Sequence, residues 1–270
     1  MLTQGIDTTT SIIVASCALF IYDYALTFSK EIDLFWRQGR QTWAFAFFIA
    51  NRYIGVLGRI PEFFWIFFPN SSGLNNSVCS DLYLSAQIFV VVLQVIGSAI
   101  MIGRVYAFYN RDRRVLSLLA VVGMICIGVS SWALSYRPPP SPSKKIATVE
   151  VTRAGCPNPV TSVEASHLAA AWGGQLLVDA LVFILTLRQL IHSHSLGKRT
   201  FVALSLRDGA IYFAVMMAAN VANITTYLVV NPFERSMLST PTNVLCVVMI
   251  SRLMINLRNL ERKLTAELPE

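Results

Sequence analysis

Seven long apolar segments dominate this chain of 270 residues. They lie at residues 11–28, 43–68, 82–108, 115–135, 168–190, 208–230 and 237–257. Each is close to the ~20 residues that an α-helix needs to cross the hydrocarbon core of a bilayer. Inside that core the backbone must satisfy its own hydrogen bonds, which a helix does. The pattern therefore predicts an all-α integral membrane protein, folded as one domain (1–270) of seven transmembrane helices.

The composition indicates a membrane location independently of segment length. The chain is 54% hydrophobic and only 14% charged, whereas a soluble domain carries about 25% charged residues. Charges this sparse would not cover a surface in water, so we expect lipid to cover it. The first apolar segment has no Lys or Arg before it and is long enough to remain as a span, so we expect no cleavable signal peptide.

Basic residues gather in alternate connections between the segments. Five lie after the second, fourth or sixth segment (Arg137, Lys144, Lys145, Arg153 and Arg235). Twelve lie after the first, third, fifth or seventh (Lys30, Arg37, Arg40, Arg111, Arg113, Arg114, Lys198, Arg199, Arg207, Arg258, Arg262 and Lys263). Short connections rich in Lys and Arg stay on the cytoplasmic side. The predicted orientation therefore places the N-terminus outside and the C-terminus in the cytoplasm.

The net charge of +7 follows from this asymmetry. Anionic lipid of the inner leaflet attracts surface bases by about 1 kcal/mol each. The expected partner of the basic side is thus the lipid bilayer, most simply that of the plasma membrane, and no nucleic acid is expected.

Two cysteines fall on the predicted outer side, where disulfides form and persist. Cys79 precedes the third segment and Cys156 lies in the long connection before the fifth. We hypothesise that they pair, which would constrain the chain by about 2–4 kcal/mol. The other three cysteines lie inside segments, where small apolar packing residues are expected.

Polar residues recur inside the segments at a spacing that places them on one face of a helix. A charge exposed to lipid at mid-depth costs at least ~2.5–3.5 kcal/mol, so we expect these faces to point into the bundle. Depth counting from the inner boundary places Asp23, Arg52 and Asp179 at one level, and Arg59 and Glu62 lie one turn apart. Further residues could line a cavity: Gln87, Gln94, Asn220, Asn223 and Tyr227. Three interpretations remain open: bundle stabilisation, a polar ligand cavity, or an ion or proton path.

The chain lacks the residues that retinal binding, zinc binding and several kinds of catalysis require. All five lysines lie outside the segments, so a retinal Schiff base is not expected. His167 falls near one face of the membrane, whereas His192 and His194 fall near the other, so the three cannot converge on zinc. No metalloprotease, nucleophile-elbow or phosphate-loop motif occurs. We therefore expect no enzyme, no cofactor and no metal centre.

A set of short motifs resembles a known family. They are Tyr22-Asp23-Tyr24, Glu31, Leu34-Phe35-Trp36, Asn51-Arg52-Tyr53, the run from Arg104 to Tyr109, the run from Leu206 to Phe213, and the run from Ser251 to Arg258. Together they resemble a large uncharacterised family of basidiomycete fungal membrane proteins, defined by an N-terminal domain of unknown function that would cover 16–66 here. The resemblance implies seven helices and assigns no activity.

Three charges of these motifs lie near the predicted cytoplasmic ends of the third, sixth and seventh segments: Arg104, Asp208 and Arg252. One hypothesis is a polar lock that a ligand releases; the alternative is simple anchoring of helix ends. A carboxylate at position 208 also suits a helix N-terminus.

The architecture resembles seven-transmembrane receptors, which favours a receptor-like sensor with a small-molecule ligand from the outer side and a cytoplasmic effector. The third segment, however, ends in Arg-Val-Tyr rather than Asp-Arg-Tyr, and Asn231-Pro232 falls in a loop. A transporter using the Asp23–Arg52–Asp179 region, or a structural partner of other membrane proteins, therefore remains an alternative.

Overall fold

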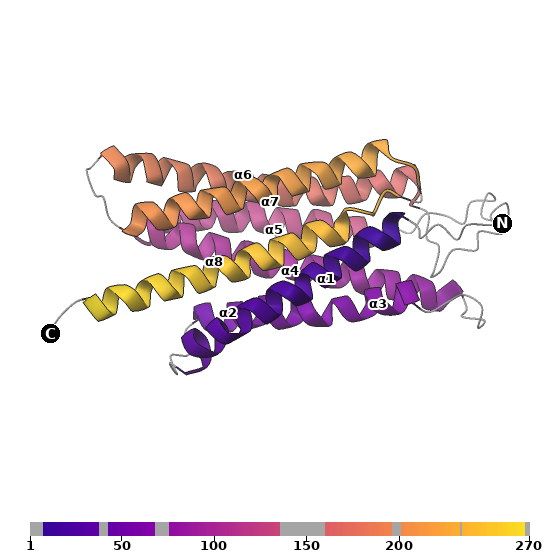
Figure 1. Cartoon of the computed structure of the whole chain (residues 1–270). Helices are drawn as coiled ribbons and strands as arrows, with labels where there is room; N and C mark the ends of the chain where they lie inside the picture. The colour runs from indigo at the N-terminus through magenta and orange to yellow at the C-terminus, as the bar shows by residue number, and fades with distance from the viewer. Residues whose placement is uncertain are drawn as a thin grey trace.

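The computed structural model describes residues 8–37, 43–67, 76–135, 160–195, 201–232 and 234–267, with only the backbone described at 65–67, 76–80, 193–195, 201–208 and 263–267. Helices form nearly all of the described chain, and no strand occurs in it (Figure 1). In order they are α1 (Thr8–Glu31), the π-helical turn η1 (Ile32–Trp36), α2 (Trp43–Leu57), α3 (Arg59–Phe67), α4 (Asn76–Phe108), α5 (Arg113–Ser135), α6 (Ser162–Ser195), α7 (Phe201–Val229) and α8 (Ser239–Glu267). The predicted all-α class is confirmed.

Six helical stretches are long and apolar enough to cross a membrane: Thr8–Trp36, Asp81–Phe108, Arg113–Ser135, Ser162–His192, Gly209–Val229 and Ser239–Arg262. The chain is therefore a multi-pass integral membrane protein. The predicted second segment, 43–68, is not one continuous helix but two. With 15 residues in α2 and 9 in α3, neither reaches the length of a span alone.

The break between α2 and α3 has a local cause. Pro61 has no N–H to donate to the carbonyl of Leu57, four residues back, and its ring crowds that carbonyl. Gly58 occupies the break, and its N–H still bonds the Ile54 carbonyl at 2.8 Å. The chain therefore bends without reversing, and α3 follows α2 along the same side of the bundle (Figure 1).

α4 lies at the centre of the bundle, in contact with α2, α3, α5, α6 and α8. α8 also packs on α1, α2 and α7, while α6 packs between α5 and α7. At one position the α4–α8 contact is very tight: a Cβ added at Gly97 would lie 2.7 Å from Ile250 Cδ1.

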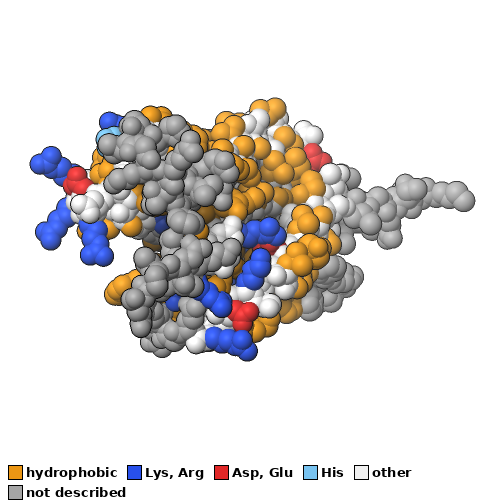
Figure 2. All heavy atoms as spheres, turned by 60° about the vertical axis from the view of Figure 1, so that its left-hand side comes forward, with side chains coloured by type: hydrophobic (Ala, Val, Ile, Leu, Met, Phe, Trp, Pro, Cys, Tyr) orange, Lys and Arg blue, Asp and Glu red, His pale blue; other side chains and the backbone are white. Residues whose placement is uncertain are grey.

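Several polar and charged side chains lie inside the bundle among apolar ones, and apolar side chains cover most of its outside, unlike the surface of a soluble helical protein. Arg52, Asn51 and Asn220 are buried, whereas Met124 on α5 is 64% exposed. Only a lipid environment makes this distribution favourable. Figure 2 shows the hydrophobic side chains of this outer surface in orange.

α1 begins at the end of the bundle opposite to the end at which α8 finishes (Figure 1). Lys and Arg side chains appear on that second end, which is turned forward in Figure 2. The exposed bases of the described chain that belong to helix ends and turns there include Lys30, Arg37, Arg111, Arg113, Arg114 and Arg262.

Candidate functional site

A buried ion pair joins the first two helical segments. Arg52 Nε of α2 lies 2.7 Å from Glu31 Oε2 at the end of α1, and the two side chains are 2% and 0% exposed. Arg52 Nη2 also donates to the Tyr24 carbonyl at 2.9 Å, and its guanidinium lies 4.2 Å from the centre of the Tyr24 ring. This arrangement neutralises both charges and adds a cation–π contact in a low-dielectric site.

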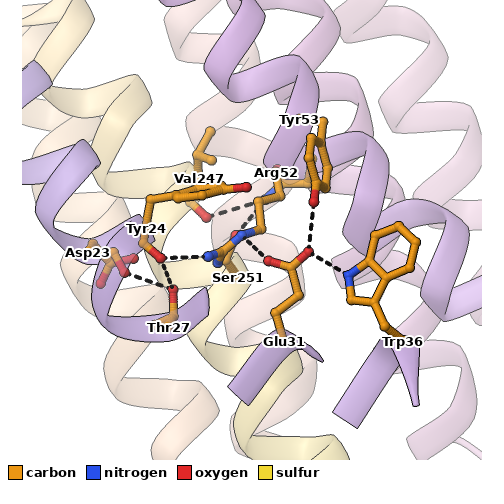
Figure 3. A network of polar contacts seen from close by, with 10 residues as sticks. Asp23, Tyr24, Thr27, Glu31, Trp36, Arg52, Tyr53, Val247 and Ser251 are labelled. Carbon is orange, nitrogen blue, oxygen red and sulfur yellow. Dashed lines mark hydrogen bonds and ion pairs between the residues drawn. The ribbon is translucent and has the colours of Figure 1, made fainter. Parts of the chain in front are cut away.

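The second oxygen of Glu31 is satisfied by aromatic donors (Figure 3). Tyr53 Oη and Trp36 Nε1 each donate to Oε1 at 3.1 Å. The wider π-helical turn η1 follows Glu31 directly and closes with a bond from Arg37 N to Ile32 O. Because Trp36 lies five residues after Glu31, this turn returns its indole to the carboxylate.

Asp23 belongs to a separate contact on α1. Its Oδ1 accepts a bond of 2.5 Å from Arg252 Nε of α8, whose side chain is 47% exposed. The expected group of Asp23, Arg52 and Asp179 is therefore not brought together. Arg52 pairs with Glu31 instead, because the faces that the helices turn toward one another, and not depth alone, decide which charges meet.

Arg59 and Glu62, which the spacing paired, lie 2.8 Å apart near the start of α3. The same two side chains reach α8: Arg59 Nη2 donates to Asn243 Oδ1 at 2.9 Å, and Thr240 Oγ1 donates to Glu62 Oε1 at 3.0 Å. All four side chains are buried. This network holds the short helix α3 against α8.

Asp179 of α6 lies in a third network, with α4 and α7. Its two oxygens accept hydrogen bonds from Asn220 Nδ2 at 2.7 Å and from Gln175 Nε2 at 3.0 Å. Gln175 Nε2 also lies 3.2 Å from Ser98 Oγ of α4. No ion pair to Asp179 occurs among the described residues.

Of the other residues that were expected to line a cavity, Tyr227 and Asn223 form hydrogen bonds with Ser239, whereas Gln87 does line a cavity. Tyr227 Oη lies 2.7 Å from Ser239 Oγ, which donates to Asn223 Oδ1 at 3.3 Å. Gln87 lines a cavity of about 40 Å³ between α3, α4 and α8 that Glu62 also borders.

Two other cavities meet at Gln94, Ser98 and Gln175. The smaller, of about 20 Å³, is central and is also lined by Asp179. The larger, of about 250 Å³, lies between α4, α5 and α6. Its walls are mainly apolar, and Met124 at its rim is exposed on the lipid-facing side.

The hypothetical polar lock of Arg104, Asp208 and Arg252 stays a prediction, because the side chain of Asp208 is not described. Arg252 pairs with Asp23, as described above. Arg104 lies beside Gly209 of α7 and 5.7 Å from the Phe108 ring, and its Nε and Nη1 have no hydrogen-bond partner among the side chains that the structure describes. The side chain of Asp208 lies outside the described residues, as do the side chain of Cys79 and the whole of Cys156. Among the described cysteines, Cys17, Cys126 and Cys246 are free.

Sequence reasoning did not place Glu31 in the site. The predicted first span ended at residue 28, which put Glu31 in a connection, whereas α1 continues to Glu31 itself. One feature of the sequence could have indicated Glu31. Arg52 lies inside a predicted span, and an arginine there needs a carboxylate partner at a similar depth.

The described residues contain no cluster of three His, Cys, Asp or Glu side chains that could hold a metal ion. In comparison with known families, residues 11–57 match the family of unknown function DUF6533. The match spans most of α1, all of η1 and α2, and hence both partners of the Glu31–Arg52 pair. No curated protein and no solved structure matches the chain.

Proposed function

We propose that this multi-pass membrane protein is a receptor-like sensor with seven crossings, an external N-terminus and a cytoplasmic C-terminus. The observation that carries the proposal is the cavity of about 250 Å³ between α4, α5 and α6, which adjoins a buried hydrogen-bond network linking three helices. The cavity is large enough for a small ligand, and a change in the hydrogen bonds of the adjoining network would alter the packing of the three helices.

The seventh crossing would be the pair α2 and α3. Together with Gly58 they make 25 residues, from 15, 1 and 9, or about 37 Å at 1.5 Å per residue, against a hydrocarbon core of roughly 30 Å. The buried charges of α2 and α3 are each compensated by an ion pair. An odd number of crossings agrees with the opposite positions of the start of α1 and the end of α8 (Figure 1).

The proposed orientation rests on the bases. Exposed Lys and Arg side chains of the described chain gather at the end where α8 finishes. Since basic connections stay in the cytoplasm, that end is assigned to the cytoplasmic side.

The cavity favours a small, mainly apolar ligand with one hydrogen-bonding group. Val95, Met124 and Ile127 line it and are exposed on the outer surface, so access through the lipid is more direct than access from water. Gln94, Ser98 and Gln175 supply the polar part of the lining. A few convergent polar groups in an apolar cavity are typical of ligand sites.

Gln175 couples this cavity to the rest of the bundle. Its amide nitrogen reaches both Ser98 of α4 and Asp179 of α6, and Asp179 accepts from Asn220 of α7. A ligand that draws the Gln175 amide into the cavity would weaken these bonds and so favour a different packing of the three helices. The coupling requires that the ligand bind the two packings with different affinity.

Cys126 gives a direct test, because it lines the cavity and its Sγ lies 3.3 Å from the Gly174 carbonyl. A variant in which the other four cysteines are replaced by Ser is expressed in cells that are exposed to organic extracts fractionated by polarity. Effector coupling and solute uptake are read in parallel. We expect apolar fractions that trigger coupling to slow the labelling of Cys126 by a maleimide dye. Coupling that leaves the labelling rate unchanged would contradict the assigned site.

A transporter is the second candidate, and the break at Gly58 favours it. Discontinuous helices form the substrate and ion sites of many transporters, and the buried pair Arg59–Glu62 follows the break directly. Solute uptake without effector coupling in the same assay would support this alternative over the sensor. Neither candidate includes an enzymatic activity.

A further inference from the structure

No described Lys, Arg or His side chain forms an ion pair with the carboxylate of Asp179. The residue is 6% exposed, and both carboxylate oxygens accept only from the neutral amides of Gln175 and Asn220. The buried arginines of α2 and α3 pair elsewhere, with Glu31 and Glu62. Amide donors lower the cost of burying a carboxylate but leave its net charge uncompensated.

A cavity lies next to this carboxylate. Its volume of about 20 Å³ corresponds to about one water-sized occupant. Helices α2, α4, α6 and α8 all contribute to the lining, which includes the polar side chains Asn51, Gln94, Ser98, Gln175, Asp179 and Asn243. Oxygen atoms are thus available from several directions around a very small space.

Two buried amide oxygens, one in the cavity lining and one close to Asp179, have no hydrogen-bond partner among the described residues. Asn51 is 1% exposed, and its Nδ2 donates to Val247 O and Ser251 Oγ, both at 3.2 Å. These two bonds fix the amide orientation, and Asn51 Oδ1 is left without a donor. Asn220 Oδ1 likewise has no partner in the described part of the chain; Asn220 donates to Asp179 through its amide nitrogen but does not itself line the cavity. Buried oxygens of this kind require an electropositive neighbour.

We propose that this cavity binds one monovalent metal cation, with Asp179 as its charged ligand and with Asn51 and Ser98 among the sources of neutral oxygen. Oxygen ligands are those that hard cations prefer. A single carboxylate balances a single positive charge, whereas Ca²⁺ sites commonly use several carboxylates and Mg²⁺ usually retains several waters. Sodium fits best, because its size is close to that of the water molecule the cavity can hold.

The proposed ion would join four helices at the polar centre of the bundle. It would hold α6, through Asp179, against α2, α4 and α8. A ligand that binds only the folded arrangement stabilises that arrangement in proportion to the logarithm of its concentration. The expected signature is therefore a sodium-dependent melting temperature.

The test uses the full chain in detergent micelles, at constant ionic strength, with sodium replaced stepwise by N-methylglucamine. We expect the melting temperature to rise with the logarithm of the sodium concentration, by on the order of 5 °C over the series, and the binding of radioactive sodium to saturate at one ion per chain. The same melting temperature in both salts would overturn the proposal and would indicate that a proton neutralises Asp179.

Three variants locate the effect. Asp179→Asn should fold and lose the sodium response. Ser98→Ala retains the charge and should shift the midpoint of radioactive-sodium binding to about tenfold higher sodium, which also tests the site should Asp179→Asn fail to fold. Glu62→Gln removes a buried carboxylate that already has Arg59 as its partner. It should lower the melting temperature at every sodium concentration, because Arg59 loses its counter-charge, and should retain the midpoint of sodium binding. A sodium response that persists in Asp179→Asn, or an unchanged midpoint in Ser98→Ala, would contradict the assignment.

Discussion

Arg52 Nε lies 2.7 Å from Glu31 Oε2, and neither side chain reaches the surface. The pair joins the end of α1 to α2. Its two charges are the most fully buried of those described in the region that matches DUF6533, residues 11–57. Removal of one partner from a buried pair leaves an uncompensated charge, which is far more costly than loss of the attraction itself.

We therefore predict that Arg52→Gln destabilises the protein by about 3–5 kcal/mol. The measurement is unfolding in detergent micelles, together with the yield of folded protein. The matched control is Arg37→Gln, because Arg37 pairs with Asp33 at 3.1 Å on the surface, with side chains 76% and 48% exposed. The control should lose no more than about 0.5 kcal/mol. Equal losses in the two variants would contradict the role given to burial.

The Asp23–Arg252 pair should behave differently, because Arg252 is half exposed. A double-mutant cycle of Asp23→Asn and Arg252→Gln should give a coupling energy below about 1 kcal/mol, with normal surface expression of all three variants. If Asp23→Asn abolished expression as Arg52→Gln is expected to do, the two pairs would not differ in the way their exposure indicates.

Filling the cavity between α4, α5 and α6 should remove ligand binding. Gly123 lines this cavity, and the nearest atom to an added Cβ is Ile102 Cδ1 at 4.0 Å, so Gly123→Leu should place its side chain in the space. We expect the variant to fold and to slow labelling of Cys126 even without ligand. Gly128→Leu on the same helix is the control, since an added Cβ there meets nothing within 4 Å. Equal labelling rates in the two variants would show that Gly123 does not control access to the cavity.

Close packing of α4 on α8 leads to a prediction about Gly97. An alanine there would bring Cβ to 2.7 Å from Ile250 Cδ1. Because Cδ1 is the flexible end of its side chain and can move, the cost should fall at the low end of the overpacking range, about 1 kcal/mol. Ile250→Val removes Cδ1 and should restore part of the loss in the double variant. Gly103→Ala, where an added Cβ meets nothing within 4 Å, should be neutral or stabilise the helix by about 0.5–1 kcal/mol. Both are read as changes in melting temperature, and the absence of any rescue by Ile250→Val would contradict the tight contact.

The helices could be predicted from the sequence because the length of each apolar run can be compared directly with the length that a membrane span requires. The break at Gly58 was harder to predict: Pro61 marks it, but the proline lies inside the predicted segment 43–68, which is long enough to be read as one span despite Arg59 and Glu62. The partners of the buried charges were not predictable in the same way. Depth along each helix can be counted from the sequence, whereas the rotation of α1, α2 and α6 about their axes follows from packing. For this reason Asp23, Arg52 and Asp179 share a depth estimate, and yet the charged group of each has a different partner.

The most direct test of the account is the side of the membrane on which each end of the chain lies. Epitope tags are placed before Met1 and after Glu270 of the same protein, and antibodies are applied to intact cells and to permeabilised cells. Seven crossings predict that the N-terminal tag is stained in intact cells and that the C-terminal tag is stained only after permeabilisation. Staining of both tags in intact cells, or of neither, would mean an even number of crossings and would contradict the assignment of α2 and α3 as one span.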